Sequence, residues 1–373
     1  MTGHSRHRGR WTPRVARTAN AGLDVVAEAM RWKRTEINVL RMAVAGISLA
    51  LLVTIGLLLG ERNAGVLAAL GALLVAGSGH VGNLRSRAND LLATAVVGSA
   101  SLLAGMLCSG GGFAGSVVVI AVAAIGAATG TIRTSVAKAG TQAAVFLIIG
   151  TSLSTGAEPV WSLLATFAAG VLLGAALTLL SYGIEFHILG RRPRPPVGVR
   201  PWREDLAAWR RGLSGLDGWR YAIRLASCML VAELFAHLVS GRHPYWILMT
   251  VVLVVQRDRS AALVRTTERA LGTALGVLVG WWLLGPVPPV LLVGVVALIG
   301  ACRMYLKSAN YTAYALVMTP LIIVLGGSGS HPDAAFLRER LADTLIACLI
   351  SLVIGTFPWT RFGREASRAR HAA

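Results

Sequence analysis

The 373-residue sequence predicts an all-α integral membrane protein of about twelve transmembrane helices, arranged as two parallel six-helix repeats with cytoplasmic N- and C-termini. Hydrophobic residues make up 55% of the chain and charged residues only 14%, whereas a bilayer crossing needs about 20 apolar residues. Long apolar runs fill two regions, separated by a short basic stretch, and the two regions share a sequence pattern. The expected segments are a basic cytoplasmic arm (1–37), a first transmembrane repeat (38–185), a basic Pro/Arg-rich cytoplasmic linker (186–220), a second transmembrane repeat (221–358) and a basic cytoplasmic tail (359–373).

The shared pattern is clearest where a basic turn leads into a helix with spaced small residues. Residues 87–98 read RANDLLATAVVG, and residues 265–276 read RTTERALGTALG. In the alignment, Arg87 matches Arg265, Asp90 matches Glu268 and Gly98 matches Gly276. A duplicated bundle commonly places its binding site between the halves near the bilayer midplane, so the repeat predicts transport.

Apolar runs define the individual helices. In the first repeat the expected spans are 38–59, 64–80, 88–108, 113–131, 137–153 and 160–184. In the second repeat they are 221–240, 244–257, 269–285, 289–303, 310–327 and 340–358. The second span of each repeat is short or Gly-rich, so each is expected either to cross the bilayer tilted or to be a half-helix buried against protein. Interruptions in matching places point to a binding site.

Loop charge sets the expected orientation. Basic residues gather beside alternate loops and after the last span: Arg85, Arg87, Arg133, Lys138, Arg191, Arg192, Arg194, Arg200, Arg203, Arg257, Arg259, Arg265, Arg303, Lys307, Arg361, Arg364, Arg368 and Arg370. The intervening loops at 108–112, 151–159, 285–289 and 326–332 are rich in Gly, Pro and Ser and nearly uncharged. Because cytoplasmic loops collect Lys and Arg, both termini and the linker are expected in the cytoplasm of a bacterium, with the spans in its inner membrane.

Composition also excludes several functions. The net charge of +19 does not predict nucleic-acid binding, because the arginines lie beside spans and no base-stacking surface accompanies them. No Walker, GxSxG, HExxH or Cys/His metal motif is present, so we expect neither an enzyme nor a cofactor. The four cysteines lack metal or redox spacing and are expected to be small buried hydrophobes.

Glu233 and His237 are the candidates for proton coupling. They are four residues apart in an apolar span and therefore share one helix face. An ionisable pair inside a span is costly and usually faces a cavity or a partner, and histidine titrates near physiological pH. The alternative is that His237 lies near the outer interface while Glu233 pairs with an arginine of another helix.

A cationic and aromatic stripe is the candidate substrate path. Its members share one helical face and enter the eleventh span: Arg303, Lys307, Asn310, Tyr311 and Tyr314. Such a face suits an aromatic carboxylate, because the cations pair with the anion and the rings stack. The alternative is positive-inside loop charge followed by interfacial tyrosines, which explains the pattern equally well.

Two charged junctions are candidates for gating or for structural ion pairs. Their residues are Gln256, Asp258, Arg265, Glu268 and Arg269 between the eighth and ninth spans, and Arg340 and Asp343 at the start of the twelfth. Arg340 and Asp343 are three residues apart, a spacing that allows a local ion pair. Most such charges are structural pairs at helix ends.

The second half resembles the fusaric acid resistance (FUSC) and aromatic acid exporter superfamily. The resemblance rests on YWILMTVVLVVQ at 245–256, followed by Asp258, Arg265 and RALGTALG at 269–276. Asn310-Tyr311, Thr319-Pro320 and the segment 340–344 fit the same pattern. The first half matches only through the repeat. The resemblance implies an exporter of aromatic carboxylic acids or a pathway for organic anions.

The leading hypothesis is a secondary, proton-driven efflux transporter of small organic acids, with aromatic acids favoured. One alternative is an organic-anion channel of the same architecture. Another is a non-transporting scaffold that docks partners or anionic lipid through its basic arms, in which residues 20–36 form a surface helix. Membrane lipids and a small organic anion are the expected partners, and a homodimer and a periplasmic adaptor are considered as protein partners.

Overall fold

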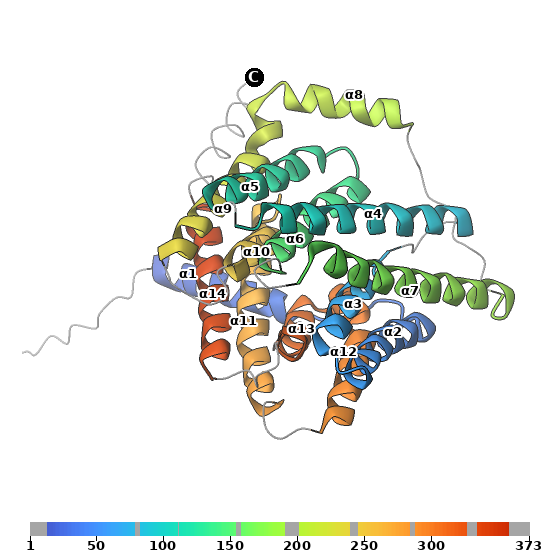
Figure 1. The fold of residues 1–373 in the computed structure, drawn as a ribbon. Helices are drawn as coiled ribbons and strands as arrows, with labels where there is room; N and C mark the ends of the chain where they lie inside the picture. Colours follow the sequence, from blue (N-terminus) through green and yellow to red (C-terminus); the bar gives the residue numbers. More distant parts are fainter. Residues whose placement is uncertain are drawn as a thin grey trace, which may run out of the picture.

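A computed structural model describes residues 13–78, 83–110, 112–153, 158–190, 201–238, 245–283, 288–326 and 334–357. Fourteen α-helices and no strands occur in these ranges (Figure 1). The helices of the arm and the first half are α1 (Pro13–Met30), α2 (Val39–Leu58), α3 (Arg62–Val75), α4 (Leu84–Cys108), α5 (Gly112–Thr129), α6 (Thr134–Leu153) and α7 (Val160–His187). Those of the linker and the second half are α8 (Trp202–Leu213), α9 (Leu216–Leu238), α10 (Tyr245–Val254), α11 (Arg259–Leu283), α12 (Pro289–Ala309), α13 (Tyr311–Gly326) and α14 (Ala334–Val353).

The fold is that of a multi-pass membrane protein. Seven helices of the described chain are long and apolar enough to cross a bilayer: α2, α4, α5, α6, α7, α9 and most of α12. The remaining five expected spans are also helical, but α3, α10 and α13 are shorter, and α11 and α14 carry several charges. The count of twelve complete crossings and the cytoplasmic location of the termini therefore stay predictions, as do the domain boundaries.

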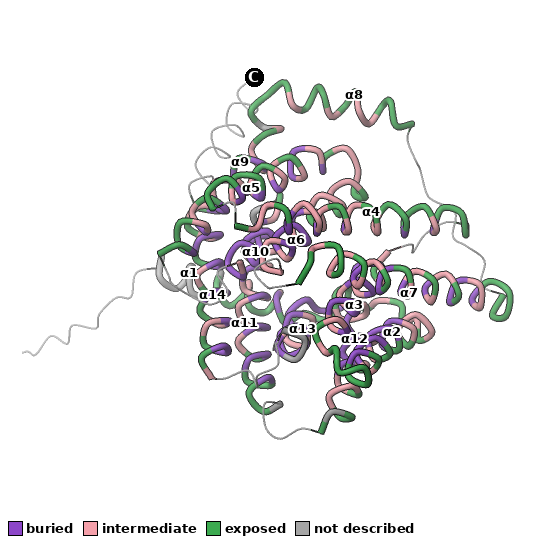
Figure 2. The backbone as a smooth tube through the Cα atoms, viewed as in Figure 1, coloured by how far each residue is buried: buried purple, intermediate pink, exposed green. Residues whose placement is uncertain are grey.

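The two shortest apolar helices are the second of each half, as the sequence indicated. The 10 residues of α10 span about 15 Å, half the thickness of the hydrocarbon core. Nearly every residue of α10 is buried, and Figure 2 shows it inside the bundle. Burial inside the bundle explains why α10 is apolar apart from Thr250 and the polar atoms of Tyr245 and Trp246, and it keeps the ends of this short helix away from lipid.

Helix packing follows the same scheme in both halves. In the first half α4 packs on α6, α3 on α7, and α5 on α6. In the second half the corresponding helices make the corresponding pairs, α11 with α13, α10 with α14, and α12 with α13. Three further pairs join the halves, because α2 packs on α12, α5 packs on α9 and α6 packs on α10. This equivalence is what packing of a duplicated bundle produces.

Small residues allow the closest helix crossings. A Cβ atom added at Gly105 of α4 would overlap the backbone oxygen of Leu147 in α6. In the second half, Gly276 of α11 lies against the backbone of α13. Its sequence counterpart, Gly98, instead meets the side chain of Leu74 in α3. The two glycines matched in the sequence therefore serve different helix contacts.

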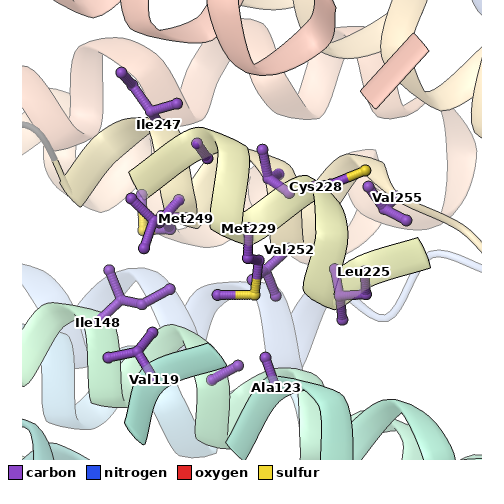
Figure 3. Close-up of a cluster of buried hydrophobic side chains, with 14 of the residues drawn as sticks. Val119, Ala123, Ile148, Leu225, Cys228, Met229, Ile247, Met249, Val252 and Val255 are labelled. Carbon is purple, nitrogen blue, oxygen red and sulfur yellow. The ribbon is translucent and has the colours of Figure 1, made fainter. Parts of the chain in front are cut away.

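The largest hydrophobic cluster joins the two halves at α10. Figure 3 shows side chains of α9 and α10, among them Met229 and Val252, facing Val119, Ala123 and Ile148 of the first half. Two of the four cysteines, Cys228 and Cys348, are buried as free thiols, and the other two are partly buried. The core therefore fixes α10 between the repeats.

The arm and the linker add helices outside the expected spans. The arm forms α1, which ends at Met30 rather than continuing to residue 36. In the linker, α8 packs beside α9 and extends along one end of the molecule (Figure 1). Trp209 of α8 donates a hydrogen bond of 3.0 Å to the backbone oxygen of Ala128, which ties the linker to the end of α5.

Candidate functional site

A large cavity lies between the two repeats. Its volume is about 2150 Å³, and its wall is built from helices of both halves, chiefly α3, α4 and α6 of the first and α10 to α13 of the second. This volume exceeds the 300–1,000 Å³ of an ordinary small-molecule pocket. The charged residues of the wall are Glu36, Arg41, Glu61, Asp90, Lys138, Glu158, Arg257, Asp258, Arg265, Arg269, Arg303 and Lys307.

Four members of the cationic and aromatic stripe line this cavity: Arg303, Lys307, Tyr311 and Tyr314. The rings of Tyr311 and Tyr314 lie with their centroids 5.2 Å apart. Arg303 is 7% exposed, and its Nη2 donates a hydrogen bond of 3.0 Å to the backbone oxygen of Leu73 in α3. Its Nε has no hydrogen-bond partner among the described residues. A buried cation and two neighbouring tyrosine rings thus face one cavity.

Asn310, the fifth member, lies outside the cavity lining. Its Nδ2 donates to the backbone oxygen of Arg31 at 3.2 Å, and its Oδ1 accepts from the Ala313 amide at 2.9 Å. Thr312 donates to the backbone oxygen of Ala29 at 2.8 Å. Asn310 therefore fastens the basic arm to the α12–α13 junction, and its assignment to a substrate path stays a prediction.

Arg265 joins the stripe from α11. Its guanidinium carbon lies 3.6 Å from the centroid of the Tyr311 ring, and its Nη1 lies 3.3 Å from Oε2 of Glu268. Arg265 and Arg269 line the cavity, whereas Glu268 does not. The pair of Arg265 and Glu268 is the local structural ion pair that the sequence allowed.

The α10–α11 junction is held by a helix cap and by hydrogen bonds from Tyr221 and Arg224 of α9 to its backbone oxygens. Gln256 and Asp258 line the cavity, and Oδ2 of Asp258 accepts from the Ala261 amide at 3.0 Å, which caps α11. The neighbouring Arg257, which the sequence did not single out, lies 4.7 Å above the Tyr221 ring and donates to the backbone oxygen of Ala127.

Arg340 and Asp343 do not form the hydrogen-bonded pair that their spacing allowed. Arg340 is 1% exposed, and its guanidinium carbon lies 3.8 Å from the centroid of the Trp246 ring. None of its three guanidinium nitrogens has a hydrogen-bond partner within the described part of the chain. The side chain lies against α10 because α14 packs on that helix. Asp343 still attracts the Arg340 charge without a hydrogen bond between them.

Glu233 and His237 share one face of α9, with His237 Nδ1 3.5 Å from Glu233 Oε1. Glu233 also accepts a hydrogen bond from the hydroxyl of Ser116 in α5, across the interface between the repeats. Neither residue lines the cavity, and the His237 side chain is 64% exposed. Their role in proton coupling stays a prediction.

The sequence analysis missed a buried ion cluster in the first repeat. Glu185 of α7 is 5% exposed and lies 2.7 Å from Arg41 Nη2 and 3.6 Å from Arg87 Nη1. Tyr182 lies against both guanidinium groups, 4.7 and 4.3 Å from their carbons. Asn38 also donates to Glu185. The available signal was one acidic residue at the end of a long apolar helix.

The second half of the chain matches a known family. Residues 227–354 match the family model described as fusaric acid resistance protein-like. No solved structure matches the chain. In the part of the chain that the structure describes, no group of three or more His, Cys, Asp or Glu residues is placed to hold a metal ion.

Three curated bacterial proteins are similar over less than half of this chain. An uncharacterized protein of Haemophilus influenzae is 33% identical over 143 residues, which is 38% of this chain and 20% of the relative. An uncharacterized protein of Synechocystis is 33% identical over 160 residues, 42% of this chain and 21% of the relative. The inner membrane protein YccS of Escherichia coli is 29% identical over 146 residues, which is 38% of this chain and 20% of the relative. The match thus spans about a fifth of each relative's length.

Proposed function

Because residues 227–354 form a fusaric acid resistance protein-like domain in a multi-pass membrane protein, we propose a secondary transporter. It exports small organic acids, chiefly aromatic ones, across the bacterial inner membrane and is driven by the proton gradient. The observation that carries this proposal is the cavity between the repeats, with Arg303, Lys307, Tyr311 and Tyr314 on its wall.

The chemistry of that wall favours an aromatic carboxylate. A guanidinium group binds a carboxylate through two parallel charge-assisted hydrogen bonds, and the buried position of Arg303 strengthens such a contact by lowering the local dielectric constant. The rings of Tyr311 and Tyr314 offer a surface for an aromatic ring. Arg265 above Tyr311 adds a third cation from a different helix.

The proton-coupling part of the proposal rests on Glu233. Its hydrogen bond with Ser116 crosses from α9 to α5 and so joins the two repeats. Alternating access moves one repeat against the other, so this contact must change during a transport cycle. Protonation of the carboxylate removes its charge and weakens its acceptor strength, which couples the proton to the movement.

The test is uptake of labelled aromatic acids into inverted membrane vesicles with an imposed pH gradient. Arg303→Gln is expected to lower uptake at least tenfold, because a hydrogen bond to a charged group contributes about 1.5–3 kcal/mol. Arg338→Gln is the matched control, since Arg338 is an exposed arginine outside the cavity lining. Glu233→Gln is expected to abolish the response to the pH gradient.

Three results would overturn parts of the proposal. Equal uptake by wild type and Arg303→Gln removes the assigned anion site. Unitary currents that persist without a proton gradient indicate a channel and remove the coupling step. If the vesicles show no flux, and deletion of residues 2–30 abolishes the function of the protein in cells, a scaffold role replaces transport.

A further inference from the structure

A second group of polar side chains lies where α10, α11 and α14 meet. Atoms without a hydrogen-bond partner in the described structure are Trp246 Nε1, Thr250 Oγ1, Arg269 Nε, Thr273 Oγ1 and all three guanidinium nitrogens of Arg340. Each of these residues is more than nine-tenths buried. Trp246 and Thr250 are one turn apart on α10, as are Arg269 and Thr273 on α11, so each pair shares a helix face.

Packing brings these faces together. α14 contacts both α10 and α11, and the guanidinium carbon of Arg340 lies 3.8 Å from the centroid of the Trp246 ring. Arg340 is repelled by Arg269 and attracted by the carboxylate of Asp343, with which it forms no hydrogen bond. Two arginines and a tryptophan therefore lie together at one buried junction of three helices. Thr250 and Thr273 lie one helical turn from Trp246 and Arg269 on the same faces.

Arg340 differs from the other buried arginines. Arg87 pairs with Glu185, Arg224 donates to the backbone oxygen of Gln256, and Arg303 donates to a backbone oxygen of α3. Among the buried arginines that the structure describes, Arg340 is the one whose three nitrogens all lack a hydrogen-bond partner. A buried cation beside a second cation is costly unless an acceptor satisfies it.

The two threonines show the same contrast. Thr266, Thr312, Thr319 and Thr344 are buried and each donates to a backbone oxygen. Thr250 and Thr273 are fully buried and make no such bond within the described chain. Hydroxyl groups that are not engaged by their own helix remain able to donate to a ligand.

We infer that Arg269 and Arg340 form an occluded binding site for the carboxylate group of a small organic acid, closed off from the cavity by the Trp246 ring. Arg269 and Trp246 line the cavity, whereas Arg340 does not. Trp246 thus stands between Arg340 and the cavity, and a turn of its side chain exposes the guanidinium. The inference rests on the proposed function, because it adds a second position on the same transport path.

The site at Arg269 and Arg340 lies close to the cationic and aromatic stripe, which supports a transport path with two successive binding positions. Arg269 follows Arg265 by one helical turn, about 6 Å along α11. An acid held by Arg265 and Tyr311 therefore needs to move only one turn to reach Arg269. Under the expected topology, α10 and α14 start at the outer face, so Trp246 and Arg340 lie on the exit side.

The test measures thermal unfolding of the purified full-length protein in a sulfate buffer, with sodium benzoate or sodium chloride added. Benzoate is expected to raise the unfolding midpoint of the wild type, because a ligand that binds only the folded state stabilises it. Arg340→Met is expected to unfold at or above the wild-type temperature without benzoate, since a buried charge without a hydrogen-bond partner is removed. Its benzoate shift is measured in an Arg303→Gln background, where the stripe does not bind the acid, and is expected to be lost. Arg269→Gln is expected to weaken benzoate binding at least tenfold.

Arg338→Gln is the matched control, because Arg338 is an exposed arginine on the same helix, and it is expected to keep the full benzoate shift. A lower unfolding temperature of Arg340→Met without benzoate would show a structural role and overturn the inference. So would a benzoate shift that Arg340→Met retains in the Arg303→Gln background. A shift produced by chloride alone, lost in Arg340→Met, would overturn the carboxylate assignment. Loss of transport in Arg303→Gln with the benzoate shift intact would support both proposals separately.

Discussion

Replacing Glu185 by glutamine is expected to destabilise the protein strongly, although the change keeps the size of the side chain. The carboxylate is 5% exposed and lies 2.7 Å from Arg41 and 3.6 Å from Arg87. It accepts a further hydrogen bond from Asn38. Through these contacts α7 is joined to α2 and α4. Glutamine removes the negative charge that both arginines share.

The size of the effect follows from burial. Breaking a buried ion pair by removing one partner costs about 3–5 kcal/mol, because the remaining charge loses its counter-ion in a low-dielectric setting. Two cations lose the same partner here, so the upper part of that range applies. With about 2 °C per kcal/mol for a large domain, the unfolding midpoint falls by about 8–10 °C.

The free cysteines provide the assay. Cys228 and Cys348 are buried thiols, so a dye that becomes fluorescent on thiol modification reports unfolding as the protein is heated in detergent. Glu28→Gln is the matched control. Glu28 makes an exposed ion pair with Arg31 at 3.3 Å, with side chains 42% and 70% exposed, and such pairs contribute about 0–1 kcal/mol. Equal midpoints for Glu185→Gln and Glu28→Gln would refute the reasoning.

Two further predictions concern packing and the arm. Gly105→Ala is expected to destabilise the protein by about 1–3 kcal/mol, because the new methyl group overlaps the backbone oxygen of Leu147. Gly294→Ala, which meets nothing within 4 Å, is expected to be neutral or slightly stabilising, and the thiol assay compares them. Trp32→Ala removes the 3.0 Å hydrogen bond to Tyr305 and the ring contact beside it, so limited trypsin digestion is expected to cleave the arm at least several-fold faster. An unchanged digestion rate would show that backbone contacts alone hold the arm.

Much of the helix order followed from hydropathy, but the helix ends did not. The ninth expected span begins at residue 269, whereas α11 begins at Arg259. Likewise, α14 begins at Ala334, ahead of the expected start at 340. In both helices the first turns carry charged residues, and the apolar part of the helix follows them. A hydropathy window cuts such turns off, although they contain buried residues such as Thr266 of α11 and Leu337 of α14.

The cationic and aromatic stripe shows what helical periodicity can and cannot predict. Helical spacing predicted that Arg303, Lys307, Tyr311 and Tyr314 share a face, and all four line one cavity. The same spacing included Asn310, which instead binds the backbone of the arm. α12 ends at Ala309 and α13 begins at Tyr311. Asn310 is therefore at the break between two helices, where a continuous helical face no longer applies.

The sequence by itself determined the membrane class, the helix order, the two short helices in matching places and the resemblance of the second half to a known family. These depend on local composition and spacing, which each segment carries alone. Only the tertiary structure decided which charges are paired. Glu185 meets Arg41 and Arg87 across three helices, while Arg340 turns from the nearby Asp343 to Trp246. The packing of helices against one another decides which groups a long side chain can reach. Residue spacing along one helix does not predict those contacts.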